Sequence, residues 1–399
     1  MCLATLREFL GLRRNILVLL GAILTLGLGQ ELWIRFMPNY LQALGASALA
    51  IGLYGTLKDL LDAIYNYPGG LLTDRWGQRR ALVFFNLLTA IGFAIYLVSP
   101  AWQWILVGLL LAQGWSGLSV PAIFSLIGET LPTQRRAMGI GVQSILQRVP
   151  ILIAPPLGGA LLVSLGILGG IRAALALSIG LAVIATWVQH RFYEVAPPSS
   201  LQVAPHPSSW PRLDPSLQRL LLSDILARMG QGLSEVFIVV YALAVVGIDA
   251  FQFGLLVALR MFTSIALYIP FATWADRAGR PPFVALTFVF FAAYPWGLAL
   301  ARDLVGLALA FVLYGLTEIG EPARKALIID LAAPERRGQQ VGLYYLLRGL
   351  AVFPASLIGG LLYARISAQA PFWASGAVAG VGALLFVLWG RRVRGAERV

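Results

Sequence analysis

The chain of 399 residues is 59% hydrophobic and only 12% charged, with a mean hydropathy of +0.79. Soluble domains carry roughly 25% charged residues, so this composition fits a bilayer as the solvent rather than water. A single cysteine excludes an intrachain disulfide, and two distant histidines offer no zinc-binding spacing, so we expect neither a metal nor a cofactor. The net charge of +12 would indicate nucleic acid only if the bases formed a patch of their own.

Unbroken apolar runs of about 18 residues recur along the chain, which is typical of membrane helices and not of the alternating strands of a barrel. We therefore predict an all-α integral membrane protein with twelve transmembrane helices. The predicted spans are, in chain order, residues 15–40, 47–72, 81–99, 103–130, 138–164, 171–190, 217–246, 251–275, 283–301, 304–331, 339–364 and 371–390. The first span has no convincing small-residue cleavage site, so we expect it to be retained.

The arginines of the predicted loops lie almost entirely on one side of this topology. Only Arg172, Arg302 and Arg365 fall on the opposite side, whereas both tails and the loop at 73–80 are rich in arginine. The positive-inside rule then predicts that both termini are cytoplasmic and that the protein lies in the cytoplasmic (inner) membrane. Because this topology accounts for the basic charge, we expect the lipid bilayer and no nucleic acid as a partner.

A segment rich in proline and serine, residues 191–215, interrupts the apolar runs at mid-chain. We predict a six-helix bundle over 1–191, a cytoplasmic linker over 192–215 and a second six-helix bundle over 216–399.

The two halves repeat each other, at an offset of 202 residues that later becomes 201. Gly45, Gly52, Lys58, Pro68, Asp74, Arg75 and Gly77 recur as Gly247, Gly254, Arg260, Pro270, Asp276, Arg277 and Gly279, and Pro121, Glu129, Arg135, Arg136 and Gly141 recur as Pro322, Asp330, Arg336, Arg337 and Gly342. A duplicated unit of this kind is typical of transporters that rock one half against the other.

The loop after the second predicted span reads GLLTDRWGQRR, and it resembles the loop G-x-L-a-D-R-x-G-R-K/R of the major facilitator superfamily. The motif residues are Gly70, Asp74, Arg75, Gly77, Arg79 and Arg80, with Gln78 in place of one base, and a degenerate second copy keeps Asp276, Arg277, Gly279 and Arg280. The likeness covers nearly the whole chain. It implies two six-helix bundles, a monomer, and transport of a small-molecule substrate by alternating access. It also implies that Asp74 and Asp276 latch a cytoplasmic gate. The alternative is that they only stabilise the loop through fixed contacts.

A second motif, in the fifth predicted span, resembles that of the proton-driven antiporters of the same superfamily. It consists of Gly141, Pro150, Ala154, Pro155, Gly158 and Gly159, with proline and alanine in two of the usual glycine positions. The resemblance favours an exporter. Close helix packing and helix bending are the alternative roles of such residues.

Ionisable residues within the spans cost at least ~2.5 kcal/mol each at the helix centre, so we treat them as candidate functional residues. The proton-coupling candidates are Glu31, Asp59, Asp62, Glu235, Glu318 and Glu321. The substrate candidates are the bases Arg35, Lys58, Arg148, Arg260, Arg324 and Arg348 and the amides Gln30, Asn66, Gln113, Gln143 and Gln147. Aromatic residues on the same helices, Tyr344 and Tyr345 among them, are further candidates. The interiors of the third, sixth, ninth and twelfth spans carry no charge, and in the superfamily those helices face lipid.

Several charges stand four residues apart and thus share a helix face. These pairs are Glu31 with Arg35, Lys58 with Asp62, Asp224 with Arg228, and Glu321 with Lys325. For each pair, a structural ion pair is the alternative to a role in transport. Glu318 and Glu321 are three residues apart, and two carboxylates that close in a low-dielectric setting are expected to titrate as a coupled pair. We therefore predict Glu318 as the proton site.

Together these features predict a secondary transporter and not an enzyme. The chain contains no GxxxxGK[ST] loop, so ATP is not the expected driving force. We expect proton-coupled efflux of a small amphipathic compound. The alternatives are proton-coupled uptake or exchange of an anionic metabolite, since bases outnumber acids in the spans, and a non-transporting sensor or lipid flippase.

Overall fold

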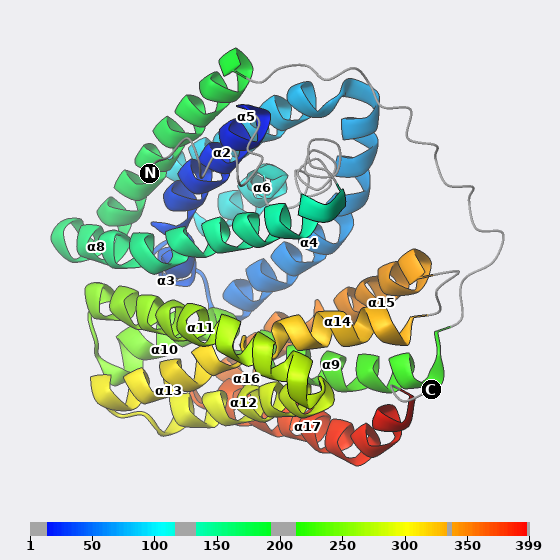
Figure 1. Cartoon of the computed structure of the whole chain (residues 1–399). Coiled ribbons are helices and arrows are strands. Elements are labelled where there is room, and N and C mark those ends of the chain that lie inside the picture. Colours follow the sequence, from blue (N-terminus) through cyan, green and yellow to red (C-terminus); the bar gives the residue numbers. More distant parts are fainter. Residues whose placement is uncertain (1–13, 116–132, 193–212, 333–336, 397–399) are drawn as a thin grey trace, which may run out of the picture. The chain divides into compact units, whose positions relative to one another are not determined.

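The computed structural model describes residues 14–115, 133–192, 213–332 and 337–396 (Figure 1). Every regular element in these ranges is helical, as predicted. The chain divides into two compact units, which we call unit 1 (Met1–Gly45 with Leu61–Val203) and unit 2 (Ala46–Leu60 with Ala204–Val399). Helix α4 (Ala48–Trp76) contributes to both units, and the predicted domain boundaries at 191 and 216 stay a prediction.

The helices follow one another in the order expected for two six-span halves. The first half comprises α2 (Arg14–Glu31), the 3-10 turn η1 (Ile34–Phe36), α3 (Met37–Ala43), α4, α5 (Gln78–Val98), α6 (Trp102–Ala112) and α8 (Thr133–Phe192). The second comprises α9 (Pro215–Ser234), η3 (Glu235–Phe237), α10 (Ile238–Tyr241), the π-helical turn η4 (Ala242–Val246), α11 (Ala250–Ala278), α12 (Pro281–Leu300), α13 (Leu304–Leu316), α14 (Glu321–Leu331), α15 (Arg337–Val352), α16 (Ala355–Arg365) and α17 (Ala370–Ala396).

Nine segments in the described part of the chain are long and apolar enough to cross a bilayer. One of them belongs to α8, whose backbone leaves the helical conformation at Gly166 and so divides into the predicted fifth and sixth spans. The predicted second span is α4, which carries Lys58, Asp59 and Asp62, and the predicted fourth begins with the apolar helix α6. Each of the twelve predicted spans therefore contains helix in the part of the chain that the structure describes, and α8 covers two of them.

Glycines end helices at matching points of the two halves. Gly45 and Gly247 have φ angles of 86° and 82°, and Gly77 and Gly279 have φ angles of 77° and 89°. Glycine reaches these angles readily because it has no Cβ. Each pair stands at the offset of 202 found in the sequence, so the repeat extends to the backbone conformation.

The first helix of each half is broken at equivalent places, where α2 gives way to η1 and α9 gives way to η3. A glycine packs against each break, since a Cβ on Gly158 would collide with the Leu32 carbonyl oxygen, and a Cβ on Gly359 with that of Leu233. These two contacts stand at an offset of 201. Between this break and Gly247 the offset rises from 201 to 202. The π-helical turn η4 lies between the two points and takes one more residue per turn than an α-helix, which accounts for the change.

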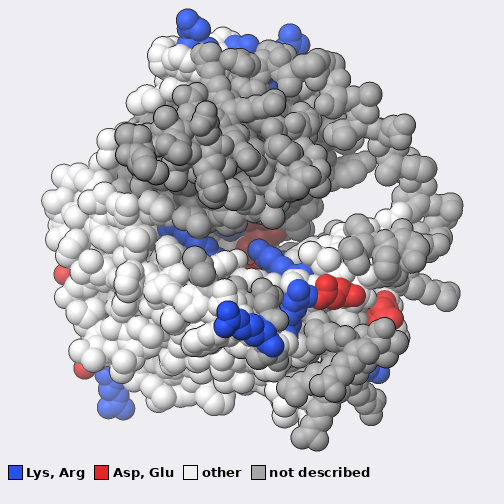
Figure 2. Space-filling model, in the orientation of Figure 1, with Lys and Arg blue, Asp and Glu red and all other residues white. Residues whose placement is uncertain are grey.

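Each unit has its own core. In unit 1, α8 packs along α2 and α5, and the ring of Trp33 makes edge-to-face contacts with Phe93 and Tyr96 at 5.0 and 5.6 Å. In unit 2, α9 packs against α12, α15, α16 and α17 and is thus the central helix. Large apolar side chains such as Leu384 and Leu388 of α17 stay exposed, as expected where lipid is the solvent. On the face drawn in Figure 2, most described atoms are uncharged and the charges gather in a few places.

Candidate functional site

Helix α9 carries a polar stripe into the apolar interior of unit 2. Asp224, Arg228 and Gln231 are spaced by four and three residues, so they lie on one face of the helix. Asp224 is fully buried, at 0% exposure, and Arg228 is half-buried. A buried carboxylate needs a positive partner or several hydrogen-bond donors, and the helices around α9 supply both.

Arg324, on α14, is the centre of this network and is 1% exposed. Its Nη1 donates to Asp224 Oδ2 at 2.5 Å, and its Nε and Nη2 donate to the two oxygens of Glu321 at 2.9 and 2.6 Å. The planar guanidinium matches the Glu321 carboxylate as a fork and leaves a further donor for Asp224. Arg324 therefore ties α14 to α9.

Arg228 is the second arginine on Glu321. Its Nη2 donates to Glu321 Oε2 at 3.0 Å, and its Nη1 donates to Gln231 Oε1 at 3.0 Å. The guanidinium carbon also lies 4.9 Å from the centre of the Phe291 ring, within cation–π distance. Glu321 is thus held by one arginine of its own helix and one of α9.

Helix α15 contributes Tyr344 and Arg348. The Tyr344 hydroxyl donates to Asp224 Oδ2 at 2.9 Å, and Arg348 Nη1 donates to the same oxygen at 3.4 Å. The Arg348 guanidinium lies over the Tyr345 ring, 4.7 Å from its centre. One carboxylate, Asp224, therefore joins three helices of unit 2.

Glu318 lies in the turn between α13 and α14 and faces Arg260 of α11. Arg260 Nη2 is 3.8 Å from Glu318 Oε1, and the two side chains are 13% and 23% exposed. The Arg260 guanidinium also lies 3.5 Å from the centre of the Tyr314 ring, which stacks on Tyr294 at 4.2 Å. Glu318 and Glu321 thus contact different arginines, and their titration as a coupled pair stays a prediction.

Comparison with known proteins adds the family. The family description Major Facilitator Superfamily matches residues 19–227 and again residues 220–398. The chain belongs to the Major Facilitator Superfamily. It is therefore a multi-pass membrane transporter and not an enzyme, with one match for each of the two halves.

Named relatives of this transporter are distant in sequence. The uncharacterized MFS-type transporter MJ1317 of Methanocaldococcus jannaschii is 22% identical over 367 residues, which are 90% of this chain and 91% of that protein. The quinolone resistance protein NorA of Staphylococcus aureus is 24% identical over 148 residues, which are 37% of this chain and 38% of NorA.

Solved structures with the same fold include two transporters of known name. The nucleoside transporter NupG superposes with a TM-score of 0.76 at 12% identity, over 94% of this chain and 99% of that one. The human organic anion transporter MFSD10 (TETRAN) superposes with a TM-score of 0.64 at 17% identity, also over 94% and 99%. At these identities the likeness shows the fold alone.

Two contacts between candidate residues lie in unit 1. Arg35 Nε and Nη2 donate to the two oxygens of Glu31 at 2.8 and 3.1 Å, the pair predicted from their spacing. Gln113 Nε2 donates to Asp62 Oδ1 at 2.6 Å, which brings a candidate amide and a candidate acid together.

The other predicted pairs involve unit 2. Lys58 Nζ lies 3.9 Å from Asp59 Oδ1, and the pairing of Lys58 with Asp62 stays a prediction. Asp224 with Arg228 and Glu321 with Lys325 are at 3.9 Å each, as the spacing predicts. Gln231 Nε2 donates to Glu235 Oε2 at 3.2 Å, so the stripe on α9 continues to the exposed acid at the break.

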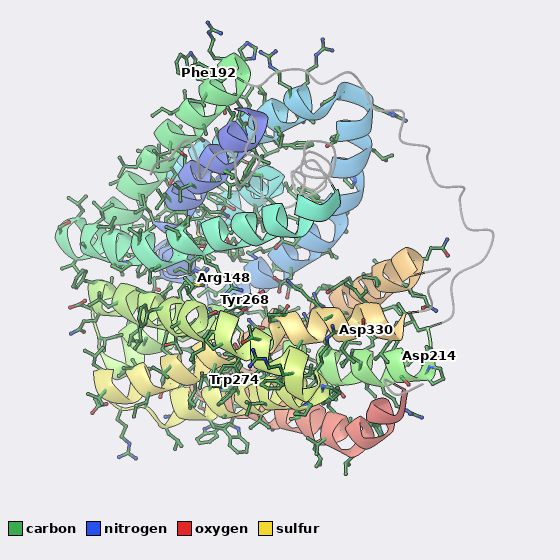
Figure 3. The ribbon with its side chains drawn as sticks, in the orientation of Figure 1. Arg148, Phe192, Asp214, Tyr268, Trp274 and Asp330 are labelled. Carbon is green, nitrogen blue, oxygen red and sulfur yellow. The ribbon has the colours of Figure 1, made fainter. Side chains whose placement is uncertain are left out.

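The remaining substrate candidates are less clustered. Gln30 and Arg148 are half-buried and Gln147 is exposed, and Figure 3 labels Arg148 on α8. The side chains of Asn66 and Gln143 lie outside the described part of the structure.

The gate motif occupies the connections from α4 to α5 and from α11 to α12. Arg79 donates to the His190 carbonyl oxygen of α8, and Arg280 forms an ion pair with Asp330 near the end of α14. Figure 3 labels Asp330. The side chains of Asp74 and Asp276 lie outside the described residues, so the latch stays a prediction.

The helix-5 motif lies where α8 packs on α2. A Cβ on Gly27 would meet Pro150 at 3.0 Å, and Gly158 contacts the Leu32 backbone. The equivalent residues of α16 contact α9 in the same way, since Gly359 faces Leu233 and the Ser356 hydroxyl donates to the Gly232 carbonyl oxygen at 3.2 Å. The motif residues of α8 and their equivalents in α16 therefore both take part in close helix packing.

Asp224 and Arg228 were not among the site residues predicted from sequence, although their local pairing was. The signal that points to them is the spacing of Asp224, Arg228 and Gln231, which places three polar groups on one face of a membrane helix. A single polar pair is compatible with a local ion pair, whereas a stripe of three requires partners on other helices.

Proposed function

We propose that this transporter exports a small amphipathic compound in exchange for protons, and that Glu318 is the proton site. The observation that carries the proposal is the contact of Glu318 with Arg260 at 3.8 Å, with both side chains partly exposed. Glu318 lies in the candidate span Leu304–Leu331 and Arg260 in the candidate span Ala250–Ala275. At this distance the pair is an ion pair without a direct hydrogen bond. Glu321, in contrast, accepts three charge-assisted bonds of 2.6–3.0 Å from Arg228 and Arg324, and its protonation would disrupt the buried network.

Protonation of Glu318 would change the contacts of α9. Arg260 loses its counter-ion when Glu318 is neutral, and it lies over Tyr314, whose hydroxyl accepts a hydrogen bond from Gln231 Nε2 at 3.4 Å. Gln231 in turn accepts from Arg228 in the buried network. A change at Glu318 is thus transmitted along side chains to the broken first helix of the second half. Alternating access needs such a link between proton occupancy and helix position.

The export direction is supported by sequence likeness. NorA is named for quinolone resistance, and it resembles this chain over 38% of its own length. The helix-5 motif contributes less, because its residues have packing equivalents in α16. The arginine-rich loops support a cytoplasmic-membrane location with both termini inside the cell.

The test is transport by the purified full-length protein in proteoliposomes under an imposed pH gradient. A fluorescent quinolone serves as the first substrate, and a pH dye in the lumen reports proton movement. When the lumen is acidic, we expect the parent protein to carry the quinolone into the lumen while protons leave it, so that the pH of the lumen rises. Glu318→Gln should lower gradient-driven flux about tenfold or more, in the range that loss of one essential proton carrier costs, while quinolone–quinolone exchange continues.

Two controls make the result specific. Asp303→Asn changes an acid that caps α13 through its bond with the Gly306 amide, and asparagine caps equally well, so flux should stay at the parent value. Glu31→Gln and Asp59→Asn test the other acids predicted from sequence. Equal quinolone flux with and without the gradient in the parent protein would contradict proton coupling, and parent-like driven flux in Glu318→Gln would remove Glu318 as the proton site.

A further inference from the structure

The buried network of unit 2 contains more positive than negative charge. In the described part of unit 2, its contacts join Arg228, Arg324 and Arg348 to two acids, Asp224 and Glu321. Arg260 is matched by Glu318, and the exposed Lys325 and Glu235 at the edges have opposite signs. Among the described residues of this network, one positive charge is therefore in excess. A charge without a counter-ion is costly in such surroundings.

The contacts identify Arg348 as the arginine that is least compensated. Arg324 has three hydrogen bonds of 2.5–2.9 Å, and Arg228 has two of 3.0 Å. Arg348 instead approaches Asp224 Oδ2 at 3.4 Å. That oxygen already accepts from Arg324 and from the Tyr344 hydroxyl at shorter distances, so a third donor is held weakly.

Arg348 is also accessible and has an aromatic neighbour. Its side chain is 24% exposed, and its guanidinium lies over the Tyr345 ring at 4.7 Å. The Tyr345 ring restricts the positions of the guanidinium, and the long contact with Asp224 orients it, which lowers the entropy lost when a ligand binds. The free edge of an arginine fork matches a carboxylate with two parallel hydrogen bonds, and the half-buried ring beside it offers an apolar surface.

We propose that Arg348 and Tyr345 form a substrate subsite for a monocarboxylate attached to an aromatic body. The single excess charge favours a monoanion, because a bound carboxylate then makes the network neutral. This inference rests on the proposed function, since it names the charge of the amphipathic compound that the transporter carries. Asp224 is a positioning residue in this site, because it holds Arg348 without neutralising it fully.

The experiment measures equilibrium binding to the purified full-length protein in nanodiscs, without a pH gradient. The probes are benzoate, 2-naphthoate and biphenyl-4-carboxylate, each compared with its primary amide, together with sulfate as a competitor. We expect at least one acid to bind saturably and about tenfold or more tighter than its amide, the difference that one bidentate charged pair typically makes. The neutral amide partitions into lipid more readily than the ionised acid, so binding to empty nanodiscs is measured for each probe and subtracted. Equal affinity for every acid and its amide, or displacement by sulfate at the concentration of the acid, would overturn the proposal.

Variants assign the preference to the subsite. Arg348→Gln leaves two arginines against two acids, so it should fold normally and lose the preference for acids about tenfold. Lys325→Gln is the matched control, since it removes a base that is 57% exposed and 3.9 Å from Glu321, and it should bind the acids like the parent. Arg348→Lys and Tyr345→Leu keep the charge and should weaken binding of the acid partly, which preserves the test if Arg348→Gln is unstable. Parent-like acid preference in Arg348→Gln, or in both Arg348→Lys and Tyr345→Leu, would overturn the proposal.

The outcome is separable from that of the proposed function. Acid preference without proton-driven flux would overturn proton coupling and leave the subsite standing. Proton-driven quinolone flux without acid preference would overturn only the subsite.

Discussion

Helices α2 and α9 are equivalent elements of the repeat, yet they carry different chemistry. At the offset of 201, Asp224 of α9 corresponds to Ile23 of α2, and Arg228 corresponds to Gly27. Ile23 is buried in an apolar cluster, and Gly27 lets α8 approach closely. The breaks after both helices and the glycine contacts against Leu32 and Leu233 are nevertheless the same. The two copies share their packing, while the buried charges of α9 have no counterpart at these positions of α2.

This difference separates the contacts that support the fold from the contacts of the candidate functional site. Contacts that recur in both copies support the fold, because each unit needs a broken first helix packed on its fifth. Contacts present in one copy, such as that of Asp224 with Arg324, need another explanation, since a buried ion pair is weak evidence for stability. The following predictions test this separation, beginning with the largest expected effect.

Asp224→Asn should be the most damaging substitution in α9. It removes the carboxylate that Arg348 contacts and one of the two acids that hold Arg324, and breaking a buried pair in this way costs about 3–5 kcal/mol. Unfolding in mixed detergent micelles measures the loss. Asp214→Asn, at the exposed start of α9, is the control and should stay within about 0.5 kcal/mol of the parent, because asparagine is also a good cap. A parent-like unfolding free energy for Asp224→Asn would show that the network does not need its central acid.

Gly158→Ala and Gly359→Ala should destabilise the two halves to a similar extent. Each added methyl group meets a backbone carbonyl oxygen, and overpacking of this kind costs about 1–3 kcal/mol. Gly21 and Gly180 have open space around the position of a Cβ, so Gly21→Ala and Gly180→Ala should be neutral or stabilising by up to about 1 kcal/mol. The same unfolding assay compares all four variants. A large effect in one half alone would mean that the shared packing is not equivalent.

Tyr40→Phe and Tyr241→Phe compare a second repeated contact. The Tyr40 hydroxyl donates to the Tyr96 carbonyl oxygen at 2.9 Å, and that of Tyr241 donates to the Ala299 carbonyl oxygen at 3.4 Å. Each loss should cost about 1 kcal/mol or less. The Tyr241 hydroxyl also accepts from Gln369 Nε2, but both of its bonds are 3.4 Å long, so we expect the larger cost at Tyr40. The order of the two unfolding free energies is the result to check, and a reversed order would contradict the comparison of distances.

Glu31→Gln should have the smallest effect on stability. Glu31 and Arg35 form a partly exposed pair on one helix face, and such pairs contribute about 0.3–0.5 kcal/mol. A double-mutant cycle with Arg35→Gln isolates this term. A coupling energy as large as that of the α9 network would give unit 1 a buried charge site of its own.

Much of the fold could be predicted from the sequence, and less of the site. The polar stripe of α9 and the local pair Glu31–Arg35 depend on spacing within one helix, which a sequence displays directly. Glu318 and Glu321 looked like one carboxylate pair, because they are three residues apart. In the structure Glu318 contacts Arg260 of α11 and Glu321 contacts Arg228 of α9, so the two carboxylates face different helices.

The amino-acid sequence is sufficient to predict the twelve spans, the duplication and the glycines at matching helix ends, because hydrophobic length and the freedom of glycine are local properties. Which arginine meets which acid on another helix depends on the packing of the helices. Asp224 and Arg324 are 100 residues apart, and Asp224 and Tyr344 are 120 apart. Their contact depends on how α9, α14 and α15 pack and on the direction of each side chain, and no spacing along the chain encodes either.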